Sequence, residues 1–345
     1  AGTIGNIKDQ PVDQIVSNMT NQDTQFRMLQ GMPGTKCYPC YDLEENKRSF
    51  DIISDRVFYI RELKSVPMDT YQVGRHDLHT IDIRWTNLCN FACVYCYPQF
   101  SSRWSDELGV THRVPTEQQL EQFKQYIFKH AGTLKHVYMA GGEPLLMREN
   151  LELLDLLYEL NPEVNLRINT NLSKTDTRVF DKICQFKNVH WTVSIESQEQ
   201  EFEYIRYGAR WTDFLENLDT IRGLDHKITF NMLHFLLNYR SIFDCVDWLK
   251  SLGFHNNSFV IGALLTPEYL NIRHLPKNVL NSVKQELEDR INQQPGYLLE
   301  NGYRNMLAYI QQPMKQDLPE AMKQLSIMDS RRNLDSKKIF KDRKS

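Results

Sequence analysis

Apolar and polar positions alternate in short runs from about residue 80 onward, and segments with the 3.6-residue period of helices separate these runs. The predicted strands are Thr80–Thr86, Lys135–Ala140, Val164–Thr170, Val189–Glu196, Lys227–Leu236 and Ser258–Ala263. The predicted helices between them are Thr116–Ala131, Glu149–Leu160, Asp176–Phe186, Trp211–Leu224 and Ser241–Leu252. Strands that alternate with helices are typical of βαβ units, whose strands form a parallel sheet.

Six such repeats fit an α/β fold, a partial (β/α)6 TIM-like barrel over residues 76–275. Residues 1–75 are predicted to be a small N-terminal unit that contains a pair of cysteines. Residues 276–345 are predicted to be a helical C-terminal extension, and we expect its helices at Asn278–Gln293 and Tyr297–Gln311 to close the barrel edge or cover its mouth. The basic run from Ser330 to the end is expected in a solvated tail or surface helix, with contact to an acidic partner as the alternative.

Several predicted strands carry polar side chains on one face and apolar side chains on the other, unlike the continuous apolar strands of most parallel sheets. The polar faces hold Asp82, Arg84, Thr86, Arg167, Asn169, Asn171, His190, Thr192, Ser194 and Glu196. If helices cover the apolar faces, these polar faces line the barrel interior. Because an unsatisfied buried polar group costs about 1 to 3 kcal/mol, the interior should hold a polar ligand.

Composition and charge disfavour several classes of protein. Lys plus Arg total 41 and Asp plus Glu total 44, so the net charge of −3 provides no global basic field that attracts nucleic acid. The chain has neither a run of about 18 apolar residues nor a signal peptide at its start. We therefore expect a soluble, cytoplasmic protein that has no membrane partner. Nucleic acid is a disfavoured partner. The chain begins at Ala1 rather than Met, as a processed or truncated product would.

Three of the seven cysteines, Cys89, Cys93 and Cys96, fall within eight residues at the spacing C-x3-C-x2-C. An odd, clustered set of cysteines suits metal ligation in a reducing compartment better than a disulfide framework. Three thiolates would leave one iron of a cubane iron–sulfur cluster free, and cluster irons prefer thiolates to oxygen donors. Zinc is the alternative, although it requires a fourth protein ligand.

This motif, with Tyr95 before its last cysteine, resembles the signature of the radical S-adenosylmethionine (radical SAM) enzymes. Downstream, Gly141-Gly142-Glu143-Pro144 resembles the GGEP motif that holds the SAM amino group in that family. The resemblance implies a [4Fe-4S] cluster on the three cysteines, with SAM bound at its open iron and cleaved reductively. The resulting 5′-deoxyadenosyl radical would abstract hydrogen from a substrate, and a one-electron reductase such as flavodoxin or ferredoxin would be a partner.

The resemblance also implies which other residues contact SAM. The two glycines let the backbone approach closely, and Glu143 offers a carboxylate to the SAM ammonium, with a helix N-terminus as its alternative location. Asn169, Asn171, Ser194 and Glu196 are the implied ribose and methionine contacts. Arg206 is the implied partner of the SAM carboxylate, or else braces a loop. Four aromatic residues near the motif, Tyr97, Phe100, Trp104 and Tyr138, are expected to pack around the cluster. The resemblance identifies no catalytic side chain.

The N-terminal unit carries a second cysteine pair, Cys37 and Cys40, at the spacing C-x2-C. This pair resembles part of the SPASM/twitch segments, which carry auxiliary iron–sulfur clusters in many radical SAM enzymes. Such clusters draw on more than two cysteines, and in most relatives the segment follows the barrel. The missing ligands could come from Cys184, from Cys245 or from upstream of Ala1. A half zinc site, a redox pair and two structural cysteines are the alternatives.

The substrate is predicted from the N-terminal unit, because SPASM/twitch segments resemble parts of peptide- and protein-modifying members. A polypeptide side chain is therefore the favoured substrate, and a nucleoside or other small metabolite is the alternative. A non-catalytic iron–sulfur protein for electron transfer or sensing is the alternative of a different class. The GGEP motif and the polar strand faces argue against it.

Overall fold

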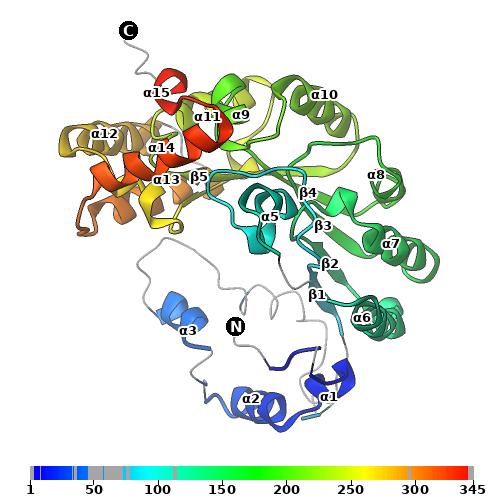
Figure 1. Ribbon diagram of the computed structural model, residues 1–345. Coiled ribbons are helices and arrows are strands. Elements are labelled where there is room, and N and C mark those ends of the chain that lie inside the picture. Colours follow the sequence, from blue (N-terminus) through cyan, green and yellow to red (C-terminus); the bar gives the residue numbers. More distant parts are fainter. Residues whose placement is uncertain are drawn as a thin grey trace.

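Figure 1 presents the computed structural model of the chain. The structure describes residues 4–7, 9–32, 34, 37–45, 57, 73–74, 78–111, 115–293 and 297–340. Most of residues 46–77, which belong to the expected N-terminal unit, lie outside the described residues, as do the last five residues of the basic C-terminal run. The boundaries of the three predicted domains therefore stay predictions.

The core of the fold is a parallel sheet of six strands in the order β1-β2-β3-β4-β5-β6. Its strands are β1 (Thr80–Ile83), β2 (His136–Met139), β3 (Asn165–Thr170), β4 (Val189–Ser194), β5 (Lys227–His234) and β6 (Phe259–Ala263). Each strand lies beside the next one in the sequence, as successive right-handed βαβ units require. All six predicted strands are confirmed, and with them the α/β class and the partial barrel.

Five helices between the strands cover the outer face of the sheet (Figure 1). They are α6 (Glu117–His130), α7 (Arg148–Leu160), α8 (Arg178–Ile183), α10 (Trp211–Arg222) and α11 (Ser241–Ser251). Thr116 caps α6 in a capping box with Gln119, as its position before the helix predicted. Helix α8 begins two residues later than expected, at Arg178, because the Thr177 hydroxyl accepts the Phe180 N–H and caps the helix there, and it ends at Ile183 instead of Phe186.

The two faces of the sheet differ as the residue pattern predicted. Trp191, Phe230 and Phe259 belong to the apolar face and are fully buried under the helices. On the other face Arg167 is exposed and His190 is half-buried.

The polar side chains of the inner face partly satisfy one another. The Nε of Arg167 donates to the Thr192 hydroxyl at 3.1 Å, and His190 hydrogen-bonds to Thr229 through its Nε2. These two pairs are therefore satisfied without a bound ligand. The case for a polar cofactor depends on the cysteine loop as well as on the polar face.

The N-terminal residues form three short helices, α1 (Val12–Val16), α2 (Met19–Leu29) and α3 (Tyr38–Glu45). Helix α1 packs against α6, beside the first strand (Figure 1). Among the described residues, no helix has both the length and the apolar character needed to cross a bilayer.

The C-terminal extension is helical as predicted, with α12 (Lys277–Gln293), α13 (Tyr297–Gln311), α14 (Leu318–Arg332) and α15 (Ser336–Ile339). Helix α13 packs along β6, where Gly302 approaches Ile261 so closely that a Cβ would lie 3.0 Å from the isoleucine Cβ. The extension therefore closes the open edge of the sheet. The expectation of a solvated basic run was wrong for Arg332, whose residue is only 7% exposed because it forms an ion pair with Glu107.

Candidate functional site

The cysteine loop, residues 84–101, follows β1 and lies at the carboxyl end of the parallel strands, where active sites of α/β barrels gather. Cys93 is buried, and Cys89 and Cys96 are half-buried. Burial raises the pKa of Cys89 to about 11 and raises that of Cys96. The charges of Cys89 and Cys96 add to the rise of the Cys93 pKa, so the three sulfurs lie within electrostatic reach of one another.

The three cysteines provide the donor set of a cluster. Cys89, Cys93 and Cys96 are buried or half-buried in one loop, and their sulfurs lie within electrostatic reach of one another. In a [4Fe-4S] cluster each thiolate binds a different iron, so three thiolates leave the fourth iron open. A structural zinc site would require a fourth protein ligand. The residues present therefore fit a cluster with three protein ligands.

Backbone hydrogen bonds fix the loop against the segment that follows α9 (Glu199–Ile205). The N–H of Ala92 donates to the Tyr207 carbonyl and the N–H of Val94 donates to the Ile205 carbonyl, both at 2.8 Å. The loop thus forms a short ladder with a chain segment more than a hundred residues away. Because Cys93 lies between Ala92 and Val94, these two hydrogen bonds fix the backbone on both sides of it.

A short helix inside the same connection, α5 (Ser102–Leu108), supports the loop from the other side. The indole N–H of Trp104 donates to the Cys93 carbonyl at 2.7 Å, and the Ser101 hydroxyl donates to the Phe91 carbonyl at 2.6 Å. Trp104 is buried as expected, whereas Phe100 is 52% exposed and does not provide the predicted packing. Helix α5 was not predicted, because its seven residues are too few to establish a period.

The GGEP residues pack directly against the residue that precedes Cys89. The N–H of Glu143 donates to the Leu88 carbonyl at 2.8 Å. Gly141 and Gly142 have φ angles of 77° and 48°, and a Cβ on Gly142 would lie 2.1 Å from the Leu88 carbonyl oxygen. Only glycine permits this approach, so the motif joins the ends of β1 and β2.

The Glu143 side chain joins β2 to β3 at the same level. Its Oε1 accepts bonds from the Thr170 hydroxyl at 2.8 Å and from the Leu145 N–H at 3.1 Å, and its Oε2 accepts the Asn171 N–H at 2.7 Å. Burial raises its pKa to about 7 in spite of these bonds. Glu143 is therefore the N-cap of the 3-10 helix η5 (Pro144–Leu146), as the alternative interpretation predicted, and its contact with SAM stays a prediction.

Asn171 brings the end of β3 to the loop. Its Nδ2 lies 3.9 Å from the Cys89 sulfur and donates to the Asn90 side-chain oxygen at 3.1 Å. Asn169 and Ser194 lie half-buried on the inner face of the sheet. The structure thus places the predicted cofactor contacts of β3 and β4 beside the cysteines or on the face that leads to them.

Glu196, Arg206 and Tyr95 form one buried network beside the loop. The Arg206 guanidinium donates from Nε to Glu196 Oε2 at 2.8 Å and from Nη2 to Oε1 at 2.6 Å. The Tyr95 hydroxyl donates to the same Oε1 at 2.9 Å. The Glu196 charge raises the pKa of Arg206, and the Arg206 charge in turn opposes the rise in pKa of Cys93.

This network gives each of its members a structural partner inside the protein. A bidentate pair between guanidinium and carboxylate is a strong and geometrically specific contact. Arg206 therefore does brace the loop through Tyr95 and Glu196. Its implied contact with the SAM carboxylate, and the implied ribose or methionine contact of Glu196, stay predictions.

The second cysteine pair lies apart from this network, at the start of α3. Cys37 and Cys40 are both half-buried. The described residues bring no third His, Cys, Asp or Glu to them in the geometry of a metal site. An auxiliary cluster on this pair stays a prediction.

Comparison with known proteins relates the chain to one family. Residues 83–249 match the family model described as the radical SAM superfamily. A curated GTP 3',8-cyclase of Sulfurimonas denitrificans is 26% identical over 179 residues, which cover 49% of this chain and 51% of that protein. A 7-carboxy-7-deazaguanine synthase of Clostridium acetobutylicum is 33% identical over 135 residues, 39% of this chain and 54% of that protein. The chain thus spans about half the length of these curated relatives.

Solved structures with similar folds were also found. The structure described as native anSMEcpe with bound AdoMet has a TM-score of 0.47 and 16% identity, with 63% of this chain and 62% of that chain covered. Streptococcus suis SuiB bound to the precursor peptide SuiA has a TM-score of 0.46 and 15% identity, with 86% and 67% covered.

Proposed function

We propose that the cysteine loop binds a [4Fe-4S] cluster and SAM, and that the chain uses them to remove a hydrogen atom from a substrate, because residues 83–249 match the radical SAM superfamily. One observation carries this proposal. The cysteine loop, the GGEP turn and the Glu196–Arg206 pair lie together at the carboxyl ends of the strands. The Leu88–Glu143 and Tyr95–Glu196 bonds connect these three parts.

The three cysteines are the proposed ligands of the cluster. Three thiolates leave one iron available to the amino and carboxylate groups of SAM. When bound, the cluster supplies one electron and SAM supplies the 5′-deoxyadenosyl group that takes the hydrogen atom. The positive charge of Arg206 favours the thiolate form of all three cysteines.

The residues around the cysteines are proposed to position SAM and to exclude water. The Gly141-Gly142 turn leaves room for backbone contact with the SAM amino group, and Asn169, Asn171 and Ser194 offer polar side chains along the inner face. A guanidinium has five N–H donors, of which Glu196 takes two, so the SAM carboxylate is proposed to use another donor of Arg206. A one-electron reductase such as flavodoxin or ferredoxin is the proposed electron donor.

The proposed substrate is a polypeptide side chain, as the SPASM/twitch-like cysteine pair suggests. A nucleotide or other small metabolite is the second candidate. It is favoured by curated relatives whose name specifies GTP. Mass shifts in co-expressed peptides, compared with mass shifts in the metabolite pool, would separate the two.

The test of the proposed function is the release of 5′-deoxyadenosine from SAM by reconstituted protein with dithionite. We expect release by the wild type and by Cys184→Ala, which changes a cysteine outside the loop, and no release by Cys93→Ala. A Cys93→Ala variant as fast as the wild type would refute the assignment of the cluster. A wild type whose EPR spectrum does not respond to SAM would instead support the non-catalytic iron–sulfur protein.

A further inference from the structure

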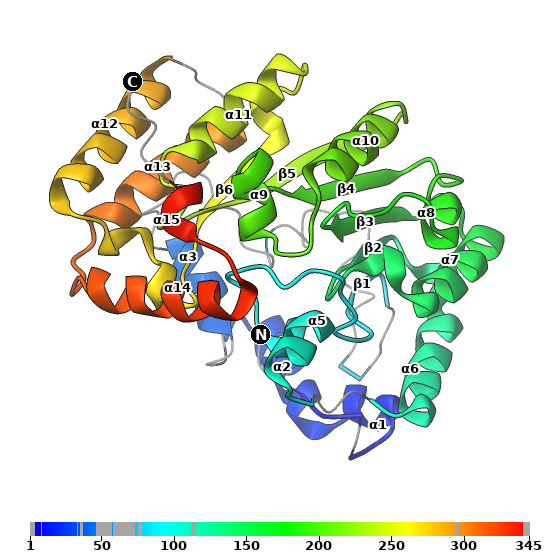
Figure 2. The same ribbon diagram turned by 45° about the horizontal axis from the view of Figure 1, so that its top comes forward.

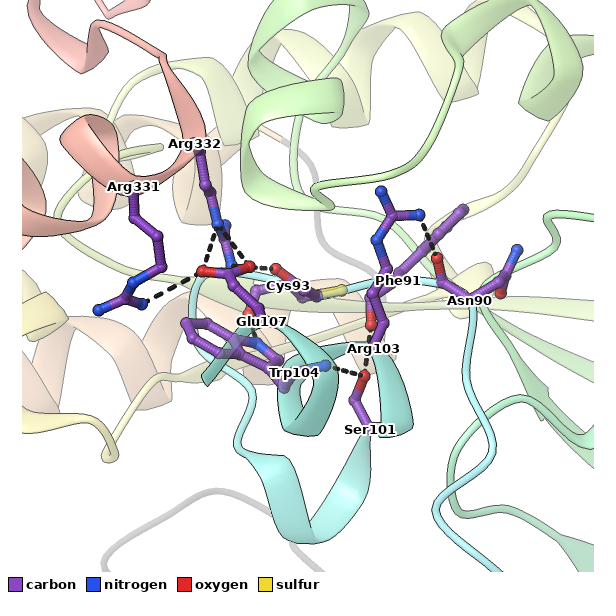
Figure 3. A network of polar contacts seen from close by, with 10 residues as sticks. Asn90, Phe91, Cys93, Ser101, Arg103, Trp104, Glu107, Arg331 and Arg332 are labelled. Atoms are coloured by element: carbon purple, nitrogen blue, oxygen red, sulfur yellow. Dashed lines mark hydrogen bonds and ion pairs between the residues drawn. The ribbon is translucent and has the colours of Figure 1, made fainter. Parts of the chain in front are cut away.

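The C-terminal helix α14 reaches the cysteine loop through its last residue, Arg332. Figure 3 shows this contact, in which Arg332 enters from α14 and meets the loop beside Cys93. The Nη2 of Arg332 donates to the Ala92 carbonyl at 2.8 Å. A residue about 240 positions away in the sequence thus holds the peptide that precedes Cys93.

Contacts on every side orient the Arg332 guanidinium. Its centre lies 4.6 Å from the Trp104 ring and 4.4 Å from the Tyr207 ring, within the range of cation–π attraction. Its Nε lies 3.1 Å from both carboxylate oxygens of Glu107. Because Trp104 and Tyr207 also bind the loop directly, Arg332 completes a layer of side chains behind Cys93.

Arg331 is a natural reference for this contact. Both arginines contact Glu107, and Arg331 does so at 3.2 Å. The side chain of Arg331 is 35% exposed, whereas that of Arg332 is only 1% exposed. Arg332, the buried arginine, is therefore the one that contacts the loop.

The buried orientation of Arg332 leaves one donor unsatisfied. Its Nη1 has no hydrogen-bond partner among the described residues. Burying a donor without a partner is unfavourable. The guanidinium keeps this orientation with its bonds to Glu107 and to the Ala92 carbonyl.

A second contact connects α14 to the other half of the ladder. The Tyr204 hydroxyl donates to Asp329 at 2.7 Å, and Asp329 also accepts the N–H and the hydroxyl of Ser336 at 2.9 and 2.7 Å. Tyr204 immediately precedes Ile205, whose carbonyl binds the loop at Val94. Figure 2 shows α14 and α15 beside the loop and α9. The C-terminal helices thus contact both strands of the ladder that contains Cys93.

We propose that Arg332 is a positioning residue for Cys93, so that the C-terminal extension forms part of the cluster site. The proposal depends on the proposed function only for the identity of the bound groups. Arg332 fixes the Ala92 carbonyl, Trp104 fixes the Cys93 carbonyl, and together they set where the Cys93 sulfur is presented. Loss of the Arg332 contact should therefore affect the cluster before it affects the fold of the sheet.

The test compares Arg332→Met/Glu107→Gln with Arg331→Met. The double variant removes the Ala92 bond and also neutralises Glu107, whose remaining partner would be the more exposed Arg331, so a weakened ion pair does not itself destabilise the protein. Iron and sulfide per chain, the EPR spectrum of the reduced protein and its titration with SAM are measured for both variants. For the double variant we expect loss of iron, or SAM binding weakened by about tenfold, the size of one lost charge-assisted hydrogen bond.

The control Arg331→Met should match the wild type in all three measurements. A double variant whose iron content, EPR spectrum and SAM titration match those of Arg331→Met would overturn the positioning role. If the double variant does not fold, Arg332→Lys replaces it, because one ammonium group cannot reproduce the planar contact with both Glu107 and Ala92. A wild type that binds no cluster would refute the proposed function, which is a separate outcome.

Discussion

The two cysteine motifs of this chain differ in what surrounds them. The motif at Cys89–Cys96 follows a strand of the sheet and receives backbone or side-chain bonds from three distant parts of the chain. The pair Cys37 and Cys40 lies at the start of the short helix α3, in a segment whose described side chains are half-buried or exposed. Both motifs have spacings typical of metal ligands.

The difference shows that cysteine spacing is only one part of a cluster site. A cluster requires its ligands in fixed positions and in surroundings that control solvent access and charge. Around the first motif, the hydrogen bonds of Glu143, the ion pair of Arg206 with Glu196 and the Trp104 contact fix the loop and control its charge. Around the second motif, the described residues bring no third His, Cys, Asp or Glu into the geometry of a metal site.

The largest expected effect concerns the iron content of anaerobically reconstituted protein. Cys93→Ala should lose the iron of the loop, about four atoms per chain for a cubane cluster, and with it the SAM-dependent EPR signal. Replacing Cys37 and Cys40 together should remove less iron, because no third ligand accompanies this pair among the described residues. Iron and sulfide analysis of both variants measures the difference. Equal losses would contradict the distinction between the motifs.

The fold and the first motif could be predicted because their signals are local and repeated. Six alternations of strand and helix determined the sheet order, and the polar faces at Arg167 and His190 followed from the two-residue period. The cysteine spacing and the GGEP residues indicated the site itself. Contacts that join distant segments have no such period, so Glu107 and Arg332 could not be paired from the sequence.

The roles of individual side chains were predicted less well than their location. Glu143 and Arg206 are at the site as expected, but each has strong partners inside the protein. The sequence suggested them as ligand contacts, because the sequence alone does not show which residue a charged side chain near a motif pairs with. Arg332 of the basic run near the C-terminus was misinterpreted for the same reason, since charge runs are usually solvated, whereas Lys337 and Lys338 are exposed as expected.

Removing the cation of the buried pair should have the second largest effect. Arg206→Met leaves Glu196 buried without a counter-charge, and such a loss destabilises proteins by about 3 to 5 kcal/mol. Urea unfolding of the metal-free protein measures the change, and Arg206→Met/Glu196→Gln should recover part of it. The exposed pair of Arg210 and Asp213 offers a control, because Arg210→Met should change stability little. Equal midpoints for the two arginine variants would show that the pair does not support the loop.

Two glycines with positive φ provide a finer test of the loop. Gly142→Ala would place a Cβ 2.1 Å from a backbone oxygen of the loop, whereas Gly109→Ala at the end of α5 would place its Cβ in open space. The left-handed conformation alone costs an alanine about 1 to 2 kcal/mol. Gly109→Ala should lose about that much stability, and Gly142→Ala should lose more and also bind less iron. Thermal unfolding and iron analysis distinguish the two, and equal losses would contradict the close packing of GGEP on Leu88.

The last expected effect is the most gradual one, a pH dependence that Glu143 gives to the metal-free protein. Burial raises its pKa from the ordinary value of 4.5 to about 7, so between these values the folded chain holds a proton that the unfolded chain has released. The contribution of Glu143 to the free energy of unfolding should therefore be largest below pH 4.5 and fall by about 1.4 kcal/mol per pH unit up to pH 7. Glu143→Gln, which does not titrate, should lack this slope. Urea unfolding of both proteins between pH 5 and 7 measures the difference, and parallel curves would mean that the Thr170, Leu145 and Asn171 bonds keep the carboxylate charged throughout.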